Sequence, residues 1–176
     1  MTKLRWVFLG IVTAAACGGD AGSGPVSQST AQEGCQRDCQ HEIDCGSTAT
    51  LAECTASCVA DTVGVIRTDA FTDIIDCRTA LACDAPSDPC LAECQPTAAH
   101  DHWHDQCQTA LAACVPAADL AALCSVTPAG TGDAGYLCLV TPAIMDELTA
   151  CIPTGVACEQ AMTCLQNVAT AHHLDF

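Results

Sequence analysis

The chain has 176 residues, of which half are hydrophobic, only 3% are aromatic and 17 are cysteines. Its formal net charge is −16, with 21 acidic residues against five basic ones. Such a surface repels nucleic acid, whose phosphates need basic side chains to neutralise them, and it repels bare anionic lipid headgroups. Positively charged partners, either ions or basic proteins, are the ones that electrostatics permits.

The first seventeen residues have the features of an export signal. Lys3 and Arg5 give a basic start, and the apolar stretch over residues 6–16 is shorter than the ~20 residues that span a bilayer. Three alanines then precede Cys17. This pattern resembles the lipobox of bacterial lipoproteins, although Ala14 departs from the bulkier aliphatic residue usual there.

The resemblance to lipoproteins has three implications. Residues 1–16 are expected to be a cleaved signal peptide, and Cys17 is expected to carry a lipid. The mature protein is then exported and lipid-anchored to the bacterial cell envelope, at the outer membrane. Removing residues 1–16 leaves three arginines against 21 acidic residues, a formal charge of −18.

The composition after Cys17 changes near residue 35. Residues 17–34 are rich in Gly, Ser, Thr, Gln and Ala, which predicts a flexible tether. From residue 35 to residue 176 the apolar residues recur at helical spacing, and strand-like alternation is absent. We therefore expect an all-α, disulfide-rich domain of stapled antiparallel helices, which could divide into subunits 35–97 and 98–176.

Sequence signals place eight helices in this domain. Thr50 and Glu53 have capping-box spacing, and Asp88-Pro89 and Thr141-Pro142 supply an N-cap and a first-turn proline. In chain order, the first expected helix covers residues 32–45, and the next three begin near Leu51, at Thr68 or Asp69, and at Asp88. The fifth and sixth cover residues 98–115 and 117–124, and the last two begin at Thr141 and at Thr154.

Sixteen cysteines lie between Cys35 and Cys164, and few large apolar side chains are present to form a core. In an exported chain, disulfides are expected to supply the stability that a small core lacks. Three Cys-x-x-x-Cys pairs are present, at 35/39, 54/58 and 90/94. The Cβ atoms of such a pair lie ~5–6 Å apart on a helix, whereas a disulfide needs ~3.5–4.5 Å. Each pair should therefore bond to a neighbouring helix.

The first two pairs are symmetric about Gly46-Ser47. An antiparallel hairpin with Cys35–Cys58 and Cys39–Cys54 bridges fits this spacing. Residues 35–58 resemble a double-CxxxC hairpin of the α-hairpinin type, a likeness of scaffold and not of activity. Nine of the sixteen cysteines lie within 35–94 and seven within 107–164, so full oxidation requires at least one bridge between the halves.

Two patterns offer a metal-binding alternative. Paired thiolates suit copper or zinc, provided that the cysteines are reduced. In the segment from His100 to Asp105, His100 and His104 share a helix face and could hold Zn(II) or Cu(II), with His172 or His173 as further ligands. The competing interpretation is a solvated helix face, which the incomplete ligand set favours.

Catalytic sequence motifs are absent, including the nucleophile elbow, the zinc-protease helix and the phosphate-binding loop. We therefore expect a lipid-anchored, non-enzymatic structural or binding module that needs no cofactor. Its partner would be an unknown protein or a cationic molecule. The alternative is an envelope lipoprotein that binds copper or zinc through His100 and His104 or through cysteine thiolates.

Overall fold

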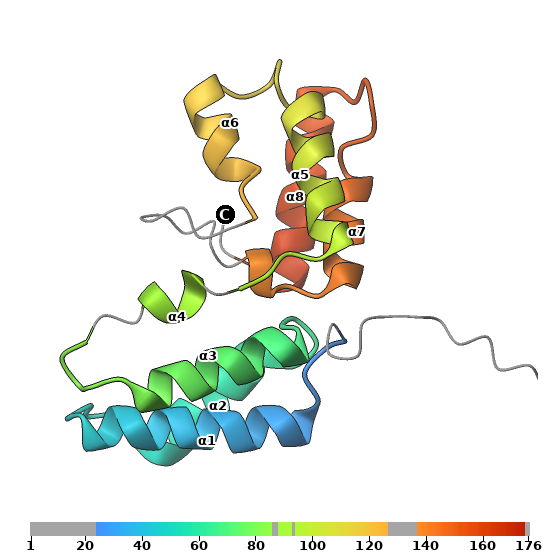
Figure 1. Ribbon diagram of the computed structural model, residues 1–176. Coiled ribbons are helices and arrows are strands. Elements are labelled where there is room, and N and C mark those ends of the chain that lie inside the picture. Colours follow the sequence, from blue (N-terminus) through green and yellow to red (C-terminus); the bar gives the residue numbers. More distant parts are fainter. Residues whose placement is uncertain (1–23, 86–87, 93, 127–136, 175–176) are drawn as a thin grey trace, which may run out of the picture.

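The computed structural model describes residues 24–85, 88–92, 94–126 and 137–174, and within these it is all-α, as predicted (Figure 1). None of the described helices is long and apolar enough to cross a membrane. The helices are α1 (Gln28–Asp44), α2 (Leu51–Thr62), α3 (Thr68–Ala80), α4 (Asp88–Ala92), α5 (Ala98–Ala110), α6 (Ala117–Leu123), α7 (Pro142–Ala150) and α8 (Cys158–Ala171).

The first helical group packs α2 and α3 against α1, and α4 lies beside α3 (Figure 1). The Thr50–Glu53 capping box starts α2, as the sequence predicts. Helices α1 and α3 approach closely at Gly34, where an added Cβ would lie 2.5 Å from Cε1 of Phe71. The small core of this group consists of Val26, Ala31, Cys35, Val59, Phe71 and Ile75.

The second helical group contains α5, α6, α7 and α8, and α7 packs against both α5 and α8 (Figure 1). Its core is larger and surrounds the fully buried Trp103. Most of the other large side chains in this core are aliphatic, among them Leu111, Val140, Ile144, Met145, Leu148, Ile152 and Leu165.

Three short segments are joined by backbone hydrogen bonds between the two groups, and we call them the seam: residues 24–26, 65–68 and 139–141. Isolated antiparallel bridges pair Pro25 with Arg67 and Ile66 with Val140. Backbone hydrogen bonds run from Val26 N to Ile66 O (2.9 Å) and from Arg67 N to Leu139 O (2.8 Å). The middle segment therefore connects the start of the fold to the second group.

All sixteen cysteines of the described residues are joined in eight disulfides. Cys35 bonds Cys58 and Cys39 bonds Cys54, which is the pairing that the symmetric spacing predicts. One bridge, Cys94–Cys138, joins the two helical groups. The other five are Cys45–Cys83, Cys77–Cys90, Cys107–Cys124, Cys114–Cys158 and Cys151–Cys164.

The predicted tether is wrong over its last part. Helix α1 begins at Gln28, where the Ser27 hydroxyl accepts a hydrogen bond from Thr30 N, and not near residue 32. Val26 is only 2% exposed because it packs beneath α1 and α3. Residues 24–34 are therefore part of the folded domain, while Cys17 and the rest of the tether lie outside the described residues.

Helix α8 also differs from its prediction, because it begins at Cys158 and not at Thr154. Gly155 has a φ of 80°, in the left-handed region that glycine tolerates best. That conformation makes a turn between α7 and α8, and the helix can start only after it.

Candidate functional site

His100 is a core residue and not a metal ligand. Its side chain is fully buried, and both of its ring nitrogens are hydrogen-bonded within the protein. Nε2 lies 2.9 Å from the carbonyl oxygen of Leu137, to which it donates. Nδ1 accepts from the backbone N–H of Thr97 at 3.1 Å. The expectation of a metal site at His100 is therefore wrong, and so is the expectation of a solvated helix face there.

Burial also affects the pKa of His100. Desolvation lowers the pKa of this imidazole, although its hydrogen bond to the Leu137 carbonyl opposes the shift. Because Nδ1 accepts from Thr97 and Nε2 donates to Leu137, the ring is neutral and joins the first turn of α5 to Leu137. His100 thus acts as a helix cap.

The other histidines do not complete a ligand set. His104 Nδ1 lies 2.8 Å from the carbonyl of Cys124, and His172 Nε2 lies 2.9 Å from Glu147. His173 is exposed after the end of α8. Across the described ranges there is no group of three or more His, Cys, Asp or Glu side chains that could hold a metal. The described cysteines carry no thiolate, because all of them are in disulfides.

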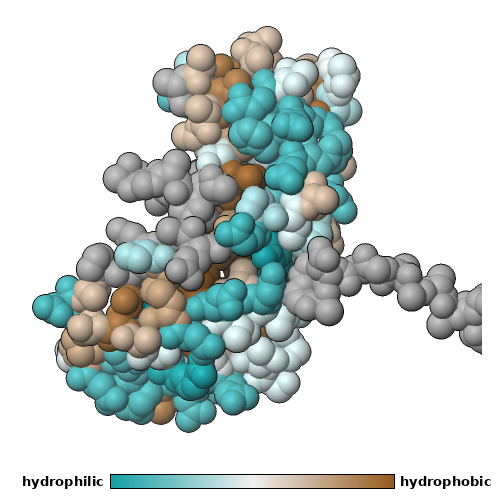
Figure 2. All heavy atoms as spheres, viewed as in Figure 1, coloured by the Kyte–Doolittle hydropathy of each residue, from teal (hydrophilic) through white to brown (hydrophobic). Residues whose placement is uncertain are grey.

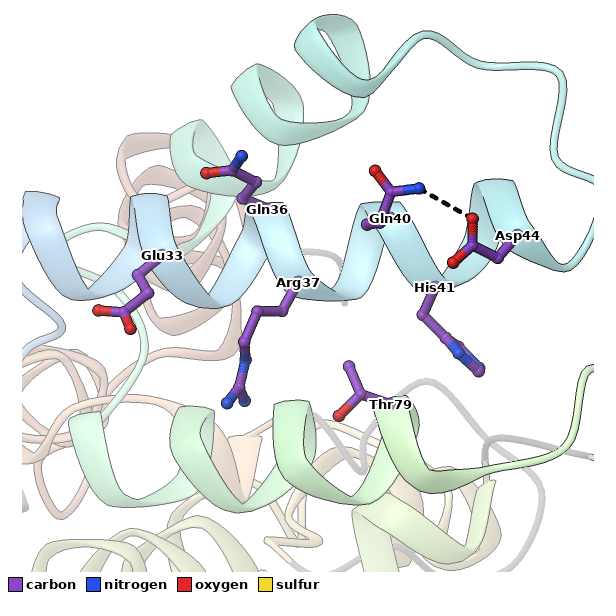
Figure 3. Close-up of a pocket in the computed structure, with 7 residues that line it drawn as sticks. All are labelled: Glu33, Gln36, Arg37, Gln40, His41, Asp44 and Thr79. Atoms are coloured by element: carbon purple, nitrogen blue, oxygen red, sulfur yellow. Dashed lines mark hydrogen bonds between the residues drawn. The ribbon is translucent and has the colours of Figure 1, made fainter.

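A polar groove of about 530 Å³ runs between α1 and α3, and we call it the α1–α3 groove (Figure 3). Arg37 and His41 point from α1 toward α3, and Thr79 points back from α3 (Figure 3). Gln40 donates to Asp44 at 2.9 Å along the other side of α1. The complete lining is Glu33, Gln36, Arg37, Gln40, His41, Asp44 and Thr79.

Each arginine of the described chain is paired with a carboxylate of the same chain. Arg37 pairs with Asp76, and Arg78 pairs with both Asp38 and Glu42, so these two arginines link α1 to α3. Hydrophilic side chains gather along the lower edge of the molecule, at the end where α1 lies (Figures 1 and 2). The three described arginines are therefore all paired within the chain, and most of the described carboxylates are exposed.

The third arginine, Arg67, is buried in the seam with a side chain only 3% exposed. Nε and Nη2 bind the two carboxylate oxygens of Asp69 at 3.0 and 2.8 Å. Nη1 binds the carbonyls of Gln95 (2.8 Å) and Cys138 (3.2 Å). Burial raises the pKa of Asp69, but the hydrogen bonds and charge of Arg67 outweigh it and hold that pKa below its usual range.

Sequence reasoning missed two of these residues, Arg67 and His41. Arg67 directly follows the apolar residues Val65 and Ile66, and this position in the sequence was the available signal for its burial. His41 lies four residues before Cys45, which places the two side chains on one face of α1. His41 Nε2 lies 3.7 Å from Cys45 Sγ.

No family model matches the chain, and no curated protein or solved structure is significantly similar to it. The environment therefore has to be inferred from the fold itself. A helical domain with eight disulfides indicates an oxidising compartment, either exported or extracellular.

Proposed function

We propose that this protein is a non-enzymatic structural or binding module, held on the bacterial cell envelope by a lipid at Cys17. The observation that carries the proposal is the disulfide network, which takes up sixteen cysteines and fixes both helical groups. Such a lattice gives a rigid scaffold without a large apolar core. A rigid scaffold suits display at the outer membrane, where a partner binds to a preformed surface.

The partner carries positive charge. This part of the proposal is supported by the three arginines, all of which are engaged with carboxylates of the same chain. An acidic surface attracts cationic partners and steers their approach, and salt weakens that attraction. The α1–α3 groove offers such a partner a preformed hollow, and Glu33 and Asp44 lie at its two ends (Figure 3).

The anchor is tested by fractionation. We expect the wild-type chain to incorporate labelled palmitate and to remain with membranes in high salt, which removes proteins held only by charge. Cys17→Ala should lose the label and leave the membranes or retain its signal peptide. Unchanged, salt-resistant attachment of Cys17→Ala would overturn the anchoring proposal.

The binding surface is tested with a basic peptide of ten residues and an acidic peptide of the same length. Calorimetry should detect the basic peptide only, with affinity that falls between 0.05 and 0.5 M salt. A Glu33→Gln/Asp44→Asn variant removes two charges from the α1–α3 groove. The control, Asp119→Asn/Glu159→Gln, removes two charges from α6 and α8. Equal losses of affinity in both variants would mean that binding reflects overall charge and not the groove.

A further inference from the structure

The eight disulfides differ in how far solvent can reach them. Six contain at least one buried cysteine, and their buried members are Cys35, Cys39, Cys90, Cys107, Cys124, Cys138 and Cys151. Two disulfides have no buried member: Cys45–Cys83 and Cys114–Cys158. In each of these, one cysteine is exposed and the other is half-buried. Thiol–disulfide exchange needs access to a sulfur atom, so these two bridges are the most open to it.

A histidine distinguishes the two accessible bridges. Nε2 of His41 lies 3.7 Å from Sγ of Cys45, within hydrogen-bond reach of sulfur. A disulfide sulfur carries no hydrogen, so Nε2–H donates and the sulfur accepts. No histidine hydrogen bond reaches Cys114 or Cys158 in the part of the chain that the structure describes.

The site is also open on the side of the histidine. His41 lines the α1–α3 groove, and its ring points from α1 toward α3, the helix that Cys83 follows (Figure 3). Cys45 caps the C-terminal end of α1, and Gly46, with a φ of 98°, turns the chain away directly after it. Cys83 is exposed, so a thiol can reach it from solvent, while His41 lies beside Cys45.

We propose that Cys45–Cys83 is a thiol–disulfide exchange site for a dithiol, and that His41 is the proton donor to Cys45. A thiolate of the dithiol attacks Sγ of Cys83 and forms a mixed disulfide. The Cys45–Cys83 bond breaks, and its electron pair goes to Cys45 Sγ, which takes a proton from the His41 imidazolium.

The second half of the exchange releases the partner. The second thiolate of the dithiol attacks the dithiol's other sulfur, which is bonded to Cys83 in the mixed disulfide. The electron pair of the broken bond goes to Cys83 Sγ, which takes up a proton from solvent. The dithiol leaves as a disulfide. Two electrons have moved from the dithiol to Cys45 and Cys83, which are then both thiols. A protein dithiol or a small dithiol fits this chemistry.

The fold tolerates the opening of this bridge because other contacts hold the same helices. Arg78, in the last turn of α3, binds Asp38 at 2.9 Å and also binds Glu42. The Cys35–Cys58 and Cys39–Cys54 bridges still join α1 to α2. The Cys45–Cys83 bond can therefore open and close without loss of the helical group.

The test follows each cysteine during reduction of the full-length protein in detergent. Limiting dithiothreitol is quenched with an alkylating reagent, the remaining bridges are reduced and labelled with its heavy form, and cleavage at acidic residues gives the peptides. Cys45 and Cys83 should be labelled first, together and ahead of Cys114 and Cys158. The exchange site is overturned if Cys114–Cys158 opens equally fast or faster.

The role of His41 is tested in the same assay. His41→Ala and the size-conserving His41→Gln should both slow the opening of Cys45–Cys83 by about tenfold, the scale of one charge-assisted hydrogen bond. Cys114–Cys158 should open at its wild-type rate in both variants, which also reports that the fold is intact. His173→Ala, at an exposed histidine elsewhere, should change neither rate. An unaltered Cys45–Cys83 rate in both His41 variants would overturn the assignment.

Discussion

Arg67 donates from Nη1 to the backbone carbonyl of Cys138 at 3.2 Å, and Cys138 is the residue whose sulfur joins the two helical groups. The same nitrogen binds the carbonyl of Gln95, next to the partner cysteine, Cys94. A buried cation and a disulfide therefore hold the same junction. The guanidinium supplies a hydrogen-bond donor to the carbonyl of the buried Cys138.

Removal of this guanidinium should cost much stability. We expect Arg67→Met to lower the free energy of unfolding by about 2–3 kcal/mol, because it removes a donor from the buried Cys138 carbonyl and breaks the ion pair with the half-exposed Asp69. Chemical denaturation under non-reducing conditions measures the change. Arg37→Met removes an ion pair whose side chains are 50% and 59% exposed, and it should cost less than about 1 kcal/mol. Similar losses in both variants would contradict the role of Arg67.

Cys94–Cys138 should be the covalent link that keeps the halves together after a cut between them. With a protease site inserted at Pro96, the cleaved protein should run as one band on a non-reducing denaturing gel. The same cut in a Cys94→Ala/Cys138→Ala variant should give two bands. A Cys151→Ala/Cys164→Ala variant, which lacks a bridge within one half, should still give one band. Two bands from the cleaved protein with all its cysteines would show that the pairing is different.

Gly34→Ala should destabilise the first helical group. The new Cβ would lie 2.5 and 2.6 Å from Cε1 and Cζ of Phe71, whose ring is only 6% exposed and has little room to move. Overpacking of this kind costs about 1–3 kcal/mol, and the better helix propensity of alanine offsets up to about 1 kcal/mol of it. A lower melting temperature is expected. Gly24→Ala, with no atom within 4 Å of its Cβ, serves as the control.

Stability should rise with pH across the histidine range because of His100. Its pKa is lowered in the folded state, so below the unfolded value of about 6.5 the unfolded chain binds a proton that the folded chain does not. Stability is therefore lost as pH falls from about 6.5 toward the folded pKa, by up to about 1.4 kcal/mol per pH unit. This slope should be reduced in His100→Gln and retained in His102→Gln, which alters an exposed position on α5. Equal slopes in both variants would contradict the buried, neutral His100.

Parts of this fold could be predicted because their signals are local. Capping residues and the symmetric cysteine spacing of residues 35–58 define the α1–α2 hairpin without any knowledge of the rest. Pairings such as Cys45–Cys83 depend on which helices meet, and spacing carries no such information. His100 shares helical spacing with Trp103 and Cys107, both fully buried, so the sequence contained a signal for its burial. The hypothesis of a metal site was based instead on the four-residue spacing between His100 and His104.

The seam has a mechanical consequence. Tension applied at Gly24 acts first on the hydrogen bonds between Gly24 and Thr68 and between Val26 and Ile66. If these hydrogen bonds break, the chain can unfold only as far as Cys35, because the disulfide to Cys58 holds that residue in place. Residues 24–35 span roughly 40 Å when fully extended, at ~3.6 Å per residue, so the gain in length is smaller than this value. A pull from the N-terminal side would therefore lengthen this protein by a fixed step, and most of the helices would remain folded behind the first crosslink.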